Sequence, residues 1–152
     1  MNIKEITDAL LKVPNVYSDL IQPSVKKVGE ALEIVFDYFP TLLLPLKLHN
    51  EKCKFNFQKR LAEYKDKIES IPNEKICKVN PEIGVPIIEQ LIYITDDEIA
   101  DLFTTLLTKA SSIDTINQAH PGFIQLINRL SRDEALIIKF LKKLWFYSLH
   151  NY

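Results

Sequence analysis

The chain has 152 residues, of which 47% are hydrophobic and 26% are charged, and its formal net charge is −1. This length and composition are typical of one globular domain, here residues 1–152, and exclude a disordered chain. A net charge near zero excludes a general attraction to nucleic acid or to acidic lipid, so any basic surface has to be local.

Cysteine usage and the N-terminus predict a cytoplasmic protein. Two cysteines are too few for a disulfide framework, and the first residues show no basic stretch followed by an apolar segment. The apolar segment 31–48 contains Glu33, Asp37, Pro40 and Pro45. Its two carboxylates oppose membrane insertion by about 6 kcal/mol, against about 5 kcal/mol gained from its apolar residues. We therefore expect buried core there and no spanning segment.

Two long helices are predicted first. Apolar residues recur at steps of three and four from Tyr17 to Phe39, and a narrower stripe extends from Pro45 to Ser70. The short connection between them predicts an antiparallel hairpin. Gly29 interrupts the first stripe at a cost in helix stability, so we expect it to permit the close approach of a neighbouring helix.

Four shorter helices are expected after a loop at 71–81. One spans about Glu82 to Ile92, and the next begins with a capping box, Thr95 to Glu98. His120-Pro121 opens a third, and a second box, Ser131 to Glu134, starts a last helix that ends near Leu149. Since no segment alternates with a period of two, no sheet is predicted. The fold class is all-α, a bundle of about six helices.

Nearly all of residues 16–141 resembles one family, the abortive infection alpha (Abi-alpha) domain. The resemblance is carried, in order, by NVYSDLIQPSVKKVGEAL, LLPLKLHNEKCKFNF, IPNEKICKVNPEIGVPIIEQL, YITDDEIADLFTTLLTKAS and AHPGFIQLINRLSRDEALIIKFL. It implies a bacterial protein associated with defence against phage, in which an infected cell halts growth or dies. It supplies no catalytic residues. Members of the family usually continue past the last predicted helix, so a truncated member remains an alternative.

Two groups of residues are candidates for chemical sites. His49 and Cys53 share a predicted helix face and, with Cys77 and His120, could form a zinc site, and the same residues could form a thiol–imidazole pair. Packed side chains are the commoner outcome of such spacing. The acidic cluster at Asp96, Asp97, Glu98 and Asp101 is better explained as the stabilisation of a helix N-terminus. We therefore expect no metal, no cofactor and no enzyme activity.

A local basic excess lies on the second predicted helix, including Lys52, Lys59 and Arg60. It could follow a phosphate backbone, although its charges spread around three sides of the helix. Small helical ribonucleases of abortive-infection systems place an Arg five to seven positions before a His, and His49, His120 and His150 have none there. Nucleic acid is therefore not the expected partner.

The terminal run Trp145-Phe146-Tyr147 is the strongest candidate for a contact surface. Successive residues of a helix point about 100° apart, so one helix face cannot bury all three rings. The stripe on this helix includes Leu136, Ile137, Phe140, Leu141, Leu144 and Trp145. We expect a non-catalytic interaction module that binds a protein partner or a second copy. The alternatives left open are a membrane-perturbing effector acting through Phe36 to Leu48 and a nucleic-acid binder.

Overall fold

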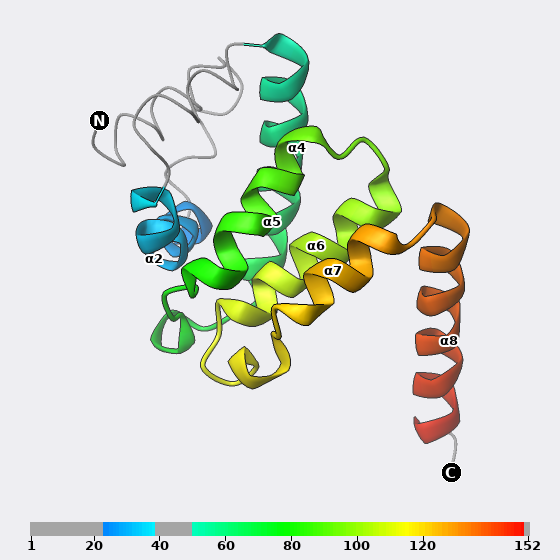
Figure 1. The fold of residues 1–152 in the computed structure, drawn as a ribbon. Coiled ribbons are helices and arrows are strands. Elements are labelled where there is room, and N and C mark those ends of the chain that lie inside the picture. The colour runs from blue at the N-terminus through cyan, green and yellow to red at the C-terminus, as the bar shows by residue number, and fades with distance from the viewer. Residues whose placement is uncertain (1–22, 39–49, 151–152) are drawn as a thin grey trace.

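A computed structural model describes residues 23–38 and 50–150 of the chain. The described residues form six α-helices and two short 3-10 turns (Figure 1). The helices are α2 (Pro23–Asp37), α4 (Glu51–Ile68), α5 (Pro81–Tyr93), α6 (Asp97–Ala110), α7 (Gly122–Arg129) and α8 (Arg132–His150), with turns η1 (Asn73–Lys75) and η2 (Ile116–Gln118). The all-α prediction is confirmed. Within the described ranges, β-type pairing is limited to one isolated bridge, Ile76 to Ser112.

The core forms around α5, which is apolar on most of its circumference. Its buried residues pack against α2, α4 and α6, and α7 lies over α6 on the far side (Figure 1). The fully buried side chains of this core include Ile87 and Leu91 of α5 itself and Leu32, Phe57 and Phe103 of the helices around it. Burial of such residues is the main stabilising term of a helical bundle. The apolar stripes predicted on α4 and α6 therefore face the core, except that Cys53, Leu61 and Leu102 are only partly buried.

One face of α4 carries four polar side chains that hold the ends of its neighbours. Asn56 donates from Nδ2 to the carbonyl oxygens of Leu91 and Ile92, both at 3.1 Å, at the C-terminus of α5. One turn on, Arg60 is 1% exposed. Tyr64 follows Arg60 by one turn and Lys67 follows it by two, so the spacing of four, four and three places all four side chains toward α5 and α6.

Arg60 joins the end of α5 to the start of α6. Its Nη2 donates to the carbonyl oxygens of Ile94 and Thr95 at 3.4 and 3.1 Å. Its Nη1 donates to Glu63 and to Asp97, each at 2.9 Å. These charge-assisted hydrogen bonds provide partners for the buried guanidinium group and, at the same time, for the free carbonyl oxygens at the end of a helix. Only its Nε–H lacks a partner among the described residues.

Tyr64 and Lys67 extend this contact along α6. Tyr64 donates its phenolic hydrogen to Ser111 Oγ at 2.6 Å, because Ser111 itself donates to the carbonyl oxygen of Leu107. Lys67 donates to Asp101 and to the hydroxyls of Thr104 and Thr105 at 2.8 and 2.9 Å. Side chains of α4 thus fix the short connection between α5 and α6 and bind α6 along its length.

A buried lysine joins α2 to the C-terminus of α4. Lys27 donates from Nζ to the carbonyl oxygens of Glu69, at 3.0 Å, and Ile71. Carbonyls at the end of a helix lack intrahelical partners and carry partial negative charge, so a cation stabilises them. The corner of the predicted N-terminal hairpin lies outside the described residues, and its antiparallel arrangement stays a prediction.

Two predicted helix starts are corrected. The second long helix begins at Glu51 rather than Pro45, with Asn50 as its N-cap. The N-cap of α6 is Asp96, not Thr95: its Oδ1 accepts from the amides of Glu98 and Ile99 at 2.9 and 3.1 Å. Glu98 does not reach back, because its carboxylate is bound to Lys139.

The second box, at the start of α8, is confirmed. Ser131 N–H donates to Glu134 Oε2 at 2.7 Å, and Glu134 N–H donates to Ser131 Oγ at 3.3 Å. On α7, Pro121 is the N-cap rather than the first helical residue. Ile124 and Ile127 of this helix face inward, whereas Phe123 is exposed.

The prediction that Gly29 permits the close approach of a neighbouring helix is wrong, because the close approach occurs at another glycine. Among the described residues, nothing lies within 4 Å of the position that a Cβ of Gly29 would take, so none of the described helices approaches it closely. Close approach occurs instead at Gly84 of α5, where a Cβ would collide with the side chain of Val35 on α2 and touch Val79 at 3.0 Å. Gly84 is therefore the residue that lets α2 lie against α5.

Alanine substitutions at these two glycines should have opposite effects. Gly84→Ala overpacks the contact with Val35 and should lower the free energy of unfolding by about 1–3 kcal/mol. Gly29→Ala meets nothing and should raise it by up to about 1 kcal/mol, because alanine favours helix. Urea unfolding of both variants measures this, and equal destabilisation would contradict the packing described at Gly84.

The cap of α6 gives a second pair of variants. Asp96→Ala removes the acceptor of two amide hydrogens and should cost about 1 kcal/mol of stability. Thr95→Ala, its matched control, should change stability by less than about 0.5 kcal/mol, as at ordinary surface positions. Thermal unfolding followed by circular dichroism checks both, and a larger loss for Thr95→Ala would restore Thr95 as the cap.

The ion pairs of Asp97 predict an acid dependence of stability. Hydrogen bonds from Lys59 and then Arg60 lower the pKa of Asp97 from 3.8 to about 2. Because its folded-state pKa is the lower one, its stabilising contribution is complete above the unfolded pKa of 3.8 and is lost as the pH falls toward 2. Asp97→Asn should make the free energy of unfolding depend less steeply on pH in that window.

Asp66→Asn is the control for this measurement, since Asp66 is exposed and has no ion pair among the described residues. Urea unfolding at a series of pH values between 2 and 5 gives the slope for each variant. If both variants matched the wild-type slope, the ion pairs of Asp97 would not contribute to stability.

Candidate functional site

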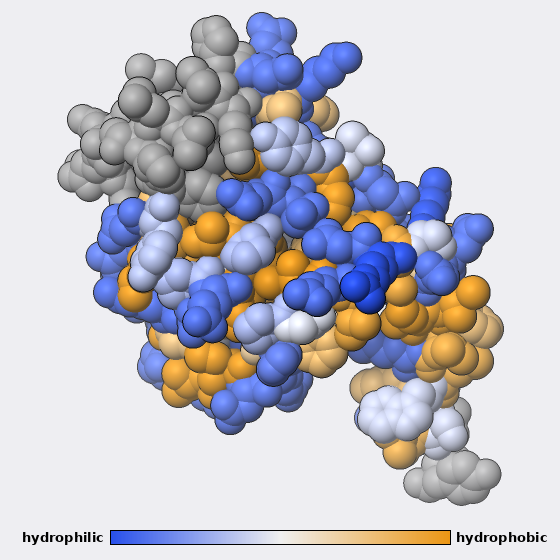
Figure 2. Space-filling view, viewed as in Figure 1, coloured by the Kyte–Doolittle hydropathy of each residue, from blue (hydrophilic) through white to orange (hydrophobic). Residues whose placement is uncertain are grey.

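The least covered element of the described structure is α8. Ala135 is buried and Lys139 half-buried, while every other residue of this helix is exposed. Its exposed large apolar side chains, each between 41% and 66% accessible, are Leu136, Ile137, Ile138, Phe140, Leu141, Leu144, Trp145, Phe146, Tyr147 and Leu149. These ten residues are called here the α8 hydrophobic surface. Figure 1 shows α8 extending away from the bundle, and Figure 2 shows hydrophobic side chains gathered along it.

The three aromatic residues of the terminal run belong to this surface. Trp145 is 66% exposed, and Phe146 and Tyr147 are each 57% exposed. The Phe146 ring stacks on His150 one turn further along, with 4.1 Å between ring centroids. The sequence correctly predicted that large aromatic area is left uncovered on this helix.

The sequence underestimated how far this surface extends. The stripe that includes Ile137, Leu141 and Leu144 was expected to pack on the bundle, but the structure leaves it exposed. A stripe at helical spacing predicts that a face is buried without saying by what. An exposed apolar area of this size on a described helix is typical of an interaction site.

Two ion pairs fix the base of α8 on α6. Lys139 Nζ contacts Glu98, and it lies 2.7 Å from Asp101 Oδ2. Partial burial acts against ionisation of Asp101, but hydrogen bonds from Lys139 and then Lys67 lower its pKa below the usual value. The acidic cluster weighed as a chemical site is thus divided among Lys59, Arg60, Lys67 and Lys139.

The candidate basic residues of α4 differ in exposure and pairing. Lys52 is exposed, and Lys59 is paired with Asp97 at 2.9 Å. Arg60 was proposed as part of a contact surface, and this is corrected: its side chain is buried between helices and its charge is matched by Glu63 and Asp97. The structure therefore does not join these three cations into one free basic face.

Three of the four candidate thiol and imidazole groups, those of Cys53, Cys77 and His120, lie in the described structure, which does not group them as a metal site. Cys53 and Cys77 are free and half-buried, Cys77 Sγ lies 3.6 Å from the carbonyl oxygen of Ala110, and burial raises its pKa. His120 Nδ1 accepts from Gly122 N–H at 3.0 Å. His49 lies outside the described residues. Within residues 23–38 and 50–150, no three His, Cys, Asp or Glu side chains are grouped to hold a metal ion.

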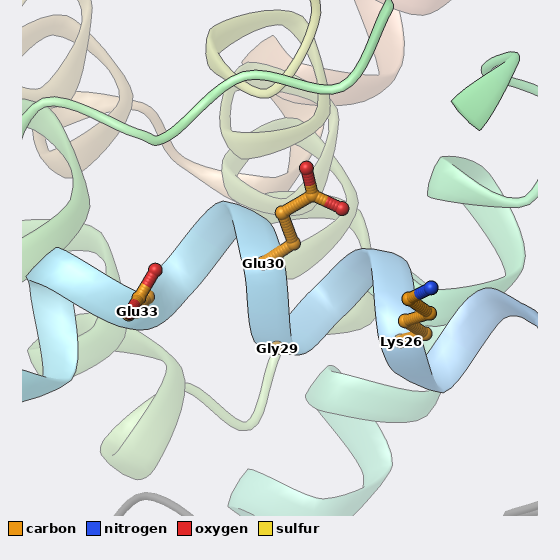
Figure 3. A pocket seen from close by; sticks show the side chains of 4 residues that line it. All are labelled: Lys26, Gly29, Glu30 and Glu33. Carbon is orange, nitrogen blue, oxygen red and sulfur yellow. The ribbon is translucent and has the colours of Figure 1, made fainter. Parts of the chain in front are cut away.

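A shallow depression on α2 offers little recognition chemistry. It is lined by Lys26, Gly29, Glu30 and Glu33, whose side chains come from a single helix and lie apart (Figure 3). Glu33 is paired with Lys78 at 2.8 Å. Among the described residues, the depression therefore combines the exposed Lys26 and Glu30 with a carboxylate that is already paired.

No helix in the described part of the chain is long and apolar enough to cross a membrane. The wedge considered for a membrane effector, Phe36 to Leu48, falls mostly outside the described residues. Phe36 itself is buried in the core.

One family model matches the chain. It is described as abortive infection alpha and covers residues 56–151, from α4 through α8 and more than half of the chain. No curated protein and no solved structure matches the chain. The matched region includes the α4 side chains that hold the bundle and the whole α8 hydrophobic surface. The chain therefore belongs to the abortive infection alpha family.

Proposed function

We propose that this chain is a non-catalytic interaction module of an abortive-infection defence protein, and that α8 is its contact element. The observation that carries the proposal is the α8 hydrophobic surface, ten large side chains on one helix with no cover among the described residues. Contiguous apolar areas larger than a few hundred Å² are rare on monomers and mark sites of contact. Family membership supplies the setting of phage defence.

The polar groups of the described structure support a structural role rather than catalysis. The carboxylates of Asp97 and Asp101 are bound by cations, and the amide, guanidinium and ammonium groups of α4 bind helix ends and the first turns of α6. Groups arranged in this way stabilise a fixed framework. The framework would hold α8 in position for binding.

Nucleic-acid binding receives less support than protein contact. A phosphate-binding face needs several cations free to replace counterions. On α4, Arg60 is buried, and Lys59 and Lys67 are paired with Asp97 and Asp101. The described structure therefore has a large exposed apolar surface on α8 and no comparable surface of free cations on α4. Protein contact is the function that we propose.

Loss of α8 contacts should abolish phage protection. In a host expressing the chain, Trp145→Ser with Tyr147→Ser should restore phage plating by tenfold or more, because the apolar contact is weakened. The matched control is Tyr38→Ser with Phe55→Ser, which removes two aromatic rings that are 65% and 71% exposed, one just after α2 and one on α4. The control should protect as the wild type does.

Circular dichroism melting of both double variants shows that each remains folded, as substitutions at exposed positions should. If the wild type gave no protection, the setting of phage defence would be wrong. If the α8 variant protected as well as the control, α8 would not be the contact element.

A further inference from the structure

The hydrophobic residues of α8 form a continuous arc around the helix. With 3.6 residues per turn, nine of the ten cover about 220° of its circumference, from Leu136 round to Leu149. Leu141 is the middle residue of α8 and lies close to the middle of the arc. Phe146 is the exception, since it lies among the lysines and stacks on His150.

The remaining side of α8 is basic and is anchored to the bundle. Lys139, Lys142 and Lys143 lie outside the arc, and Lys139 binds Glu98 and Asp101 on α6. Ala135, buried against the bundle, lies on this same side. The anchor therefore turns the arc away from α6, and the capping box at Ser131 and Glu134 fixes the start of the helix.

The area of the arc suits a helix of the same kind. A half-exposed large apolar side chain presents about 100 Å², so nine present about 900 Å². If a partner covers two thirds of them, two copies bury about 1,200 Å² in total, at the lower end of stable protein interfaces. The arc of one copy thus offers the other the apolar area that a dimer of moderate affinity needs.

We propose that two copies of this chain pair through α8, antiparallel, about a two-fold axis that passes beside Leu141. This proposal rests on the proposed function, since it names the occupant of the same surface. A two-fold interface uses one surface patch on both partners. Antiparallel pairing about Leu141 sets Trp145 of one copy against Ile137 of the other, and Leu144 against Ile138. It also sets Ser148 of one copy against Glu134 of the other, so both ends of the seam are polar.

The charges of α8 favour a second copy over a lipid surface. An amphipathic helix that lies on an acidic membrane needs free cations beside its apolar face. On α8, Lys139 is matched by two carboxylates, and Arg132 lies 3.9 Å from Asp96. Lys142 and Lys143 remain, and Asp133 and Glu134 in the first turn oppose them. The net attraction to anionic headgroups is therefore close to zero.

Sedimentation velocity of the full chain over a range of concentrations tests the pairing. The wild type should form a dimer with a micromolar dissociation constant. Leu141→Glu should weaken it about a hundredfold or more, because two carboxylates then meet across the axis. Lys142→Glu places the same carboxylate on the next residue, outside the arc, and should leave dimerisation unchanged.

A cysteine crosslink tests the geometry. In a chain carrying Cys53→Ser and Cys77→Ser, Leu141→Cys should give a disulfide-linked dimer on mild oxidation, because the two thiols meet at the axis. In the same background, the thiol introduced by Lys142→Cys points away from the seam. This variant should run as a monomer on non-reducing electrophoresis. Equal crosslinking of both would overturn the antiparallel arrangement about Leu141.

A monomeric wild type at concentrations well above micromolar would overturn the proposal. So would a wild type that stays monomeric but sediments with vesicles of phosphatidylglycerol, since lipid would then occupy the arc. In either case the proposed function fails only if the α8 double variant still protects against phage. The two failures are therefore distinguishable.

Discussion

One guanidinium group fixes the relative positions of three helices. Arg60 extends from α4, binds the last carbonyls after α5, and binds Asp97 in the first turn of α6. The free groups at helix ends are the points where a helical chain needs outside partners. Asn56, one turn before Arg60, binds the end of α5, and Lys67, two turns after it, binds α6. Side chains at regular spacing on α4 therefore set the relative positions of α5 and α6. On this framework, Glu98 and Asp101 are placed to receive Lys139 of α8.

The sequence predicted the helices well because apolar spacing reports local geometry directly. It failed where the answer depends on a neighbour. Thr95 and Asp96 can both cap a helix, and Asp96 is selected while Arg60 binds the Thr95 carbonyl and Lys139 withdraws Glu98 from a capping box. Likewise Gly29 and Gly84 both interrupt helices, but only Gly84 faces another helix at close range. The spacing of Arg60 with Asn56 and Tyr64 indicated its burial. These three residues are four apart, so they share one helix face, and this face continues the apolar stripe.

For α8, the same apolar pattern has two physical outcomes. The stripe of Ile137, Leu141 and Leu144 indicates that a face is to be covered, and inside one chain the cover is usually the core. Here Lys139 is bound to α6 and the stripe faces outward, which is the arrangement on which the proposed contact with a second copy rests. The interaction module that we propose needs a rigid body and one exposed apolar element. The framework on α4 and the arc on α8 have those two properties.

The chain contains one tryptophan, Trp145, and it lies on the α8 hydrophobic surface. Its fluorescence therefore reports the environment of the arc without a label. If α8 is covered by a second copy, the emission maximum should move to shorter wavelength as protein concentration rises, because the indole leaves water. An emission maximum typical of a water-exposed indole, unchanged from nanomolar to high micromolar concentration, would contradict the account.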